Sequence, residues 1–257
     1  KWLTVSAYVI VFARAGIAAI TIAIVLKATG QAIKLSQKRQ HIPLAITGAM
    51  LAFHWLTFFY SIQLSSVTIG LLTFASFPIF VSLIEPIMFK ESFKVSAIVQ
   101  ALLTLVGIYF VVPLHQVSES VLQGGLVGLL SAFSFAILTL LNRKFSVQHC
   151  GRTIAMMQNF YAALVLLPVM LFYQPEISLE NALGLILLGV VFTALAHSLY
   201  NLSLSVIKAQ TASIIVTLEP VYGVIAAIIL LSEPLTVSLV IGSSLIIGVN
   251  IWAMRQA

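Results

Sequence analysis

The chain has 257 residues, of which 61% are hydrophobic and only 8% are charged, and its mean hydropathy is +1.12. Soluble domains carry about 25% charged residues, so the composition excludes an ordinary soluble domain and predicts an all-α polytopic membrane protein. The net charge of +6 does not predict a nucleic-acid partner, because the basic residues lie between apolar stretches, where they act as topology signals. The single cysteine, Cys150, excludes an internal disulfide and a cysteine-based metal site, and we predict neither a metal nor a cofactor.

Nine apolar stretches follow one another along the chain. Their length and their lack of alternation predict membrane-spanning helices rather than the strands of a barrel. The stretches cover residues 4–27, 42–64, 67–89, 95–112, 122–142, 153–173, 178–204, 208–231 and 236–254.

The basic residues predict how these helices are oriented. Eleven of the 13 Lys and Arg residues fall in alternate loops and at the C-terminus, whereas the intervening loops hold Glu119, Glu176, Glu180 and Glu233. Because Lys and Arg concentrate on the cytoplasmic side of a membrane, we expect a cytoplasmic C-terminus in a protein of the cytoplasmic (inner) membrane.

An internal repeat links the two halves of the chain. With a shift of 142 residues Pro78 falls on Pro220, and the spacing from each proline to a following Glu is also repeated. The two proline-containing stretches are the third and the eighth, so they cross the membrane in opposite senses. We therefore predict two inverted five-helix repeats, 1–113 and 122–257, with a tenth helix preceding the nine visible ones. Inverted repeats are typical of transporters.

Glu219 and Arg14 are the most informative charged residues inside the apolar stretches. Glu219 directly precedes Pro220, at a depth where a carboxylate is costly unless it faces protein or water and where proline frees a backbone carbonyl. We interpret this step as a binding or gating site, and the alternative is a buried charge that only joins helices. Arg14 is either a partner of Glu219 or an anchor that reaches toward the headgroups. If the two do not pair, Glu219 could carry a proton with the substrate, which would give proton coupling.

Further polar residues inside the stretches complete the candidate site. His54 and Thr57 share one helical face, while His197, Tyr200 and Asn201 form a second polar patch in the other half. Each of these residues either lines a cavity or is an ordinary hydrogen-bonded core residue.

The amides and prolines also have two interpretations each. Gln158 and Asn159 either line the cavity or join helices by hydrogen bonds, as amides in membrane helices often do. Pro78 and Pro220 either bend their helices during transport or shape the cavity as static kinks.

Three other glutamates are predicted to have structural roles. Glu85 lies within two turns of a basic loop, so we expect an interfacial carboxylate near Lys90. Glu91 and its repeat mate Glu233 lie at the ends of the repeated stretches, where we expect them to cap the following helices.

Motifs in both halves resemble those of a known family. The first half holds Arg14, then HWLTFFYSIQLSS before the Pro78 stretch, which ends in Lys90-Glu91, and the second half holds TLEPVYGVIAAIILLSEPL. With these motifs, the helix count and the inverted halves, the whole chain resembles the EamA-type branch of the drug/metabolite transporter superfamily. The resemblance implies a ten-helix inner-membrane carrier that exports amino acids, related metabolites or drugs through a central cavity, with both termini cytoplasmic. The chain departs from this pattern in lacking the first helix.

Other function classes fit the sequence less well. The chain holds no Asp and no HExxH motif, which argues against an intramembrane enzyme, and it has no filter-like loop or ring-forming charges for a pore. We predict a secondary transporter, not an enzyme, that moves small metabolites, in particular amino acids, outward by alternating access. The alternatives are a multidrug or cation exporter and, less favoured, a pore-forming protein or an intramembrane enzyme. Gly242 and Gly248 suit a subunit contact, so a homodimer stays open.

Overall fold

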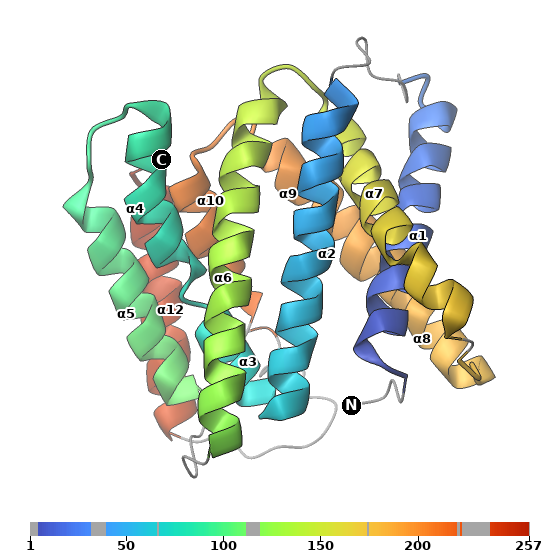
Figure 1. The fold of residues 1–257 in the computed structure, drawn as a ribbon. Coiled ribbons are helices and arrows are strands. Elements are labelled where there is room, and N and C mark those ends of the chain that lie inside the picture. The colour runs from blue at the N-terminus through green and yellow to red at the C-terminus, as the bar shows by residue number, and fades with distance from the viewer. Residues whose placement is uncertain are drawn as a thin grey trace. The chain divides into compact units, whose positions relative to one another are not determined.

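The structure, a computed structural model, describes residues 5–31, 40–65, 67–111, 119–173, 175–219, 222 and 237–256. Within these ranges all regular elements are helices, so the all-α prediction is confirmed there. The helices are α1 (Ala7–Ala28), α2 (His41–Leu64), α3 (Val67–Phe74), α4 (Phe77–Phe89), α5 (Val95–Val111), α6 (Glu119–Ser146), α7 (Gly151–Phe172), α8 (Leu179–Gly189), the π-helix η2 (Val190–Leu195), α9 (Ala196–Ser203), α10 (Ala209–Val216) and α12 (Val237–Met254) (Figure 1).

The chain forms two compact units, and each unit combines segments from both halves of the sequence. Unit 1 consists of residues 1–56 and 141–206, and unit 2 consists of residues 57–140 and 207–257. In unit 1, α1 packs against α7, α8 and η2, and α7 packs against α9. In unit 2, α5 packs against α12 and α4, and α10 packs against α4, α5 and α12. Helices far apart in sequence therefore build each unit.

Within the described residues, five helical segments are long and apolar enough to cross a membrane. They are α1, α2, α6, α7 and the continuous segment Leu179–Ser203 that α8, η2 and α9 form together. Shorter apolar helices cover Phe77–Phe89, Val95–Phe110 and Val240–Met254. The predicted number of nine spans stays a prediction, because residues 220, 221 and 223–231 of the stretch 208–231 lie outside the described residues and the stretch 67–89 is interrupted.

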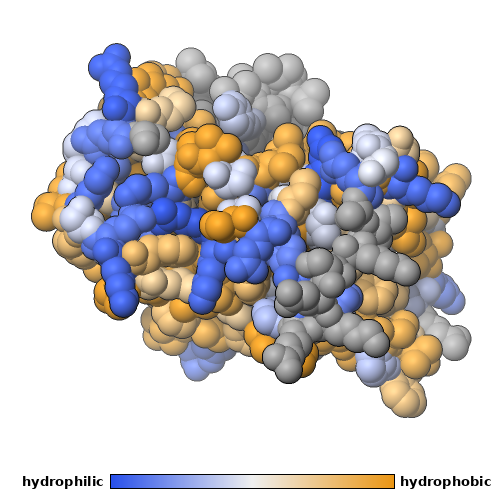
Figure 2. Space-filling model, turned by 90° about the horizontal axis from the view of Figure 1, so that it is seen from above, coloured by the Kyte–Doolittle hydropathy of each residue, from blue (hydrophilic) through white to orange (hydrophobic). Residues whose placement is uncertain are grey.

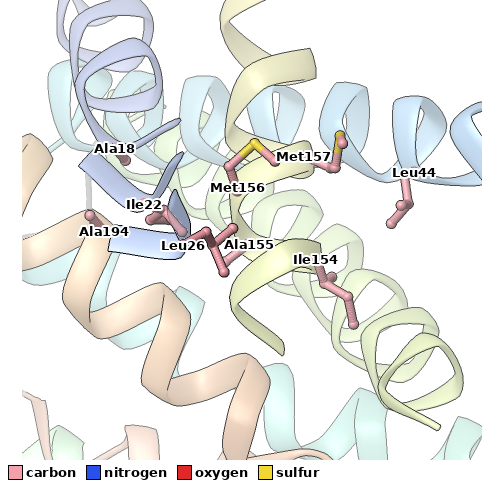
Figure 3. Packing of buried hydrophobic residues seen from close by; sticks show 9 residues of the cluster. All are labelled: Ala18, Ile22, Leu26, Leu44, Ile154, Ala155, Met156, Met157 and Ala194. Carbon is pink, nitrogen blue, oxygen red and sulfur yellow. The ribbon is translucent and has the colours of Figure 1, made fainter. Parts of the chain in front are cut away.

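The core of unit 1 is built where small residues let helices approach closely. Ala18 and Ile22 of α1 lie against Ala155 and Met156 of α7 and Ala194 of η2 (Figure 3). Because lipid tails are as apolar as these side chains, close van der Waals contact rather than water exclusion drives such packing in a membrane. Small residues on facing helices therefore stabilise this unit.

Gly48 of α2 lies at a close helix approach in unit 1, and it supplies a stability prediction. A methyl group at Gly48 would lie 2.5 Å from Cβ of Tyr161 and 2.8 Å from the carbonyl oxygen of Gln158, whereas one at Gly16 would meet no atom within 4 Å. We expect Gly48→Ala to lower the free energy of unfolding by about 1–3 kcal/mol through overpacking. Gly16→Ala, the matched control, is expected to change it by no more than about 1 kcal/mol. Denaturant unfolding in detergent measures both, and equal effects would contradict this packing.

Candidate functional site

Two helix breaks in unit 2 occur at equivalent positions of the sequence repeat. Between α3 and α4 the chain turns at Ala75 and Ser76, and after α10 it turns at Thr217 and Leu218, 142 residues later. In both turns an i to i−3 backbone bond replaces the α-helical one: Ser76 N–H donates to the Thr73 carbonyl at 3.2 Å, and Leu218 N–H donates to the Ile215 carbonyl at 3.1 Å.

The first break also shows what Pro78 does in this fold. Pro78 lies in the first turn of α4, where its missing N–H has no helical acceptor to lose. The chain therefore breaks before Pro78 and begins a new helix there. Pro220 occupies the equivalent position of the repeat but lies outside the described residues.

A small pocket lies between these two breaks. Three pairs of repeat-equivalent residues line it, together with Leu71: Phe74 with Val216, Ala75 with Thr217, and Phe77 with Glu219. Discontinuous helices in corresponding positions of two repeats are the strongest sequence-level indication of a binding site in transporters. Glu219 therefore lines the pocket between the two helix breaks, at the position that the repeat aligns with Phe77.

The groups around this pocket favour a positively charged ligand group. The exposed side chain of Glu219 lies just beyond the C-terminus of α10, whose last carbonyls carry partial negative charge. The rings of Phe74 and Phe77 stack at 5.1 Å and 15°, and Phe135 contacts both. Aromatic faces also attract cations. A carboxylate, a helix C-terminus and phenyl rings together suit an ammonium group.

A polar cluster in unit 1 centres on Arg14. The Arg14 Nε donates a hydrogen bond to Thr193 Oγ1 at 3.1 Å, and the guanidinium carbon lies 4.0 Å from the centroid of the Trp55 ring. Thr193 belongs to the π-helix, and its hydroxyl donates to the Leu188 carbonyl at 2.8 Å. The π-helix, a form often found at functional sites, thereby presents Thr193 to Arg14. A guanidinium held in this way can bind a carboxylate.

Buried polar atoms without protein partners adjoin this cluster. Asn159 Nδ2 lies 3.0 Å from His197 Nδ1, and the His197 ring lies 5.9 Å from the Trp55 ring. An amide donor at Nδ1 places the ring hydrogen on Nε2. His197 Nε2, Asn159 Oδ1 and Asn201 Oδ1 are buried and have no hydrogen-bond partner among the described residues. Such atoms normally have a partner, so they are candidate contacts for a water or a polar ligand group.

The structure brings some of the predicted site residues together and leaves others apart. Arg14 and His197 adjoin Trp55 in unit 1, and Asn201 Nδ2 bonds the His197 carbonyl at 3.1 Å. Gln158 instead exchanges hydrogen bonds with Asn142, so in the structure this amide joins α7 to α6.

Four more predicted residues divide between the two units. His54 is buried in α2, and Tyr200 is half-buried in α9. Thr57 and Glu219 belong to unit 2, whereas Arg14 belongs to unit 1.

Several residues of these sites were missed by sequence reasoning. Thr193 and Trp55 hold Arg14, and Phe74 and Phe77 flank Glu219. An aromatic or Thr residue in an apolar stretch is usually packed in the core or exposed to lipid, so residue type alone could not single them out. The repeat contained a usable signal, because Phe77 is the repeat mate of Glu219.

The structure gives specific contacts to two of the glutamates predicted to be structural. Glu85 is fully buried, and its carboxylate accepts N–H groups of Ala209 at 2.8 Å and Gln210 at 2.9 Å, while its interfacial depth stays a prediction. A carboxylate is stable there because it satisfies the first donors of α10 and opposes the helix dipole. Glu91 pairs with Lys208, and its capping of the next helix stays a prediction.

Comparison with known proteins identifies the family. The model of the EamA-like transporter family matches residues 1–112 and 122–253. The chain belongs to the EamA-like transporter family. It is therefore a multi-pass membrane transporter, and the family resemblance seen in the sequence is confirmed. The two matched segments lie in the predicted halves, while the inverted relation of the halves stays a prediction.

Similar proteins agree with this assignment. An uncharacterized transporter of Archaeoglobus fulgidus is 26% identical over 196 residues, which cover 76% of this chain and 70% of the relative. The uncharacterized transporter YxxF of Bacillus subtilis is 22% identical over 192 residues, which cover 73% of this chain and 61% of that protein. A crystal structure of a protein with 15% identity has a TM-score of 0.85 and covers 99% of this chain and 90% of its own, which shows a shared fold.

Proposed function

We propose that this EamA-like transporter exports small zwitterionic metabolites, amino acids foremost, across the cytoplasmic membrane by alternating access. The observation that carries the proposal is the pocket at the two helix breaks, where repeat-equivalent residues and Glu219 meet. Breaks at equivalent positions provide two hinge points that can open alternately, with the substrate bound beside them. Glu219 binds the substrate or couples its movement to a proton.

The charges of the two units support a zwitterion. The pocket of unit 2 suits an ammonium group because it combines Glu219 with phenyl rings. The cluster of unit 1 suits a carboxylate, because Arg14 is held there by Thr193 and orphaned polar atoms adjoin it. A zwitterion carries a group that suits each of these sites, each taken within its own unit, whereas a dication suits only the pocket of unit 2.

A cation exporter is the second candidate, and the same pocket favours it. If Arg14 does not contribute to substrate binding, the carboxylate of Glu219 and the phenyl rings would accept an apolar monocation as readily as an amino acid. Transport of a lipophilic monocation, but not of amino acids, would support this candidate.

Uptake by proteoliposomes tests the proposal. The full-length protein is reconstituted and offered labelled amino acids or labelled tetraphenylphosphonium, with and without a pH gradient. We expect saturable amino-acid uptake that responds to the gradient, and Glu219→Gln is expected to lower it about ten-fold or more, because a charged hydrogen bond contributes about 1.5–3 kcal/mol.

Glu180→Gln is the matched control. This change removes an exposed carboxylate in the first turn of α8, far along the chain from the helix breaks, and should leave uptake unchanged. Uptake that Glu219→Gln leaves intact would contradict the proposed role of the pocket and make Glu219 a structural residue.

A further inference from the structure

A second pocket of unit 2 lies where α5 and α10 begin and α12 ends. Its polar lining comes from Lys94, Gln100, Lys208, Gln210, Thr211 and Gln256, and the described residues that line it include no carboxylate. None of these residues belongs to the pocket at the helix breaks. The pocket therefore has a separate chemistry.

Hydrogen bonds within the lining occupy an acceptor and leave donors available to a ligand. Ser96 Oγ and Gln100 Nε2 both donate hydrogen bonds to Gln256 Oε1, at 3.1 and 3.3 Å. These two bonds occupy the Gln256 acceptor. Gln210 is 8% exposed, and its side-chain amide makes no hydrogen bond to a described residue although its backbone N–H is bound by Glu85. Because this amide lines the pocket and has no described partner, it is available there to a ligand or water.

The charges around the pocket limit the charge of the ligand. Glu91 pairs with Lys208, and Glu85 occupies the first N–H groups of α10, so these two carboxylates offset the positive charge on that side. Lys94 directly precedes α5, makes no ion pair with a described residue, and adds its ammonium to the positive end of that helix. The two lysines and the two carboxylates balance, so the partial positive charges at the starts of α5 and α10 leave the pocket with about one positive charge. Such a pocket suits a monoanion better than a dianion.

The surroundings place the pocket at the edge of an apolar surface. Val95 at the start of α5 is 66% exposed and Met254 at the end of α12 is 52% exposed. Figure 2 shows hydrophilic side chains gathered among hydrophobic ones on the surface where α4 ends and α5 begins. The loops at this level are predicted to be cytoplasmic, where anionic lipids attract basic residues.

We infer that this pocket binds a phosphate group in its singly charged form, as the phosphodiester of an anionic phospholipid carries it. Lys94 supplies the counter-charge, and the Gln210 amide and the Thr211 hydroxyl supply hydrogen bonds. Inorganic phosphate shares this chemistry. The inference is independent of what the transporter carries.

Lipid binding in detergent tests the inference without a charged bilayer surface. The full-length protein is mixed with phosphatidylglycerol or with phosphatidylcholine of the same acyl chains, and bound lipid is counted by native mass spectrometry. We expect a preference for phosphatidylglycerol that Lys94→Gln lowers about five-fold. A parallel titration with inorganic phosphate follows the Tm of both proteins.

Two further variants separate the pocket from general electrostatic attraction. Lys144→Gln removes an exposed lysine of α6 in unit 1, outside the pocket, and should keep the preference. Gln210→Leu leaves the charge unchanged but removes the amide, and should weaken phosphatidylglycerol binding. The two lipids could bind equally while phosphate raises the Tm of the wild type but not that of Lys94→Gln. This result would support a phosphate site whose ligand is a soluble phosphate rather than a lipid. Equal losses in Lys94→Gln and Lys144→Gln, or no effect of either ligand, would overturn the inference.

Discussion

Replacing Arg14 by glutamine is expected to lower amino-acid transport about ten-fold or more while leaving the protein folded. The guanidinium is held by Thr193 Oγ1 at 3.1 Å and by the face of Trp55 at 4.0 Å, inside a helix long and apolar enough to span the membrane. A charged hydrogen bond to a substrate carboxylate contributes about 1.5–3 kcal/mol, which corresponds to about 10- to 150-fold in affinity. Uptake into proteoliposomes at several substrate concentrations measures the loss.

Arg14→Lys separates charge from geometry. Lysine keeps the positive charge but cannot donate from a fixed planar fork while it stacks on Trp55. We expect activity between those of the wild type and Arg14→Gln. Arg152→Gln, at the start of α7, is the control for loss of an arginine outside the cluster. If Arg14→Gln is folded, as judged by its Tm, and transports like the wild type, Arg14 has only an anchoring role.

Replacing Glu85 by leucine is expected to cost about 2–5 kcal/mol of the free energy of unfolding. The carboxylate is fully buried and binds the backbone N–H groups of Ala209 and Gln210, at the start of a helix that lies 124 residues further along the chain. Leucine would leave two buried N–H groups without an acceptor, each costing about 1–3 kcal/mol. Denaturant unfolding in detergent measures the change.

Two comparisons sharpen this stability prediction. Glu85→Gln keeps one carbonyl oxygen as an acceptor, so we expect a smaller loss than for leucine. Glu119→Gln alters an exposed glutamate in the first turn of α6 and should change the free energy of unfolding by less than about 0.5 kcal/mol. A Glu85→Leu protein as stable as the wild type would show that these N–H groups find water or another acceptor.

The repeat is the part of the site that came closest to being predictable. A shift of 142 residues aligns Pro78 with Pro220, and the structure adds turns at Ala75 and Thr217, which the same shift aligns. The stretch 67–89 reads as one continuous helix because Ala75 and Ser76 are two small residues that do not interrupt its apolar run. Only the backbone hydrogen bonds of the structure reveal the break, because bonds from residue i to residue i−3 replace those from i to i−4 there.

The sequence by itself determined that the protein is helical, lies in a membrane and belongs with transporters, and that Glu219 and Arg14 are charged residues well inside its apolar stretches. These properties follow from composition, length and hydropathy, which are read along the chain without knowledge of partners. Only the tertiary structure decided that Arg14 meets Thr193, 179 residues away, and that Glu85 binds the start of α10. Helical periodicity tells which face a polar residue occupies, but a hydrogen bond between helices depends on which helix packs against that face, and packing is decided by the whole chain.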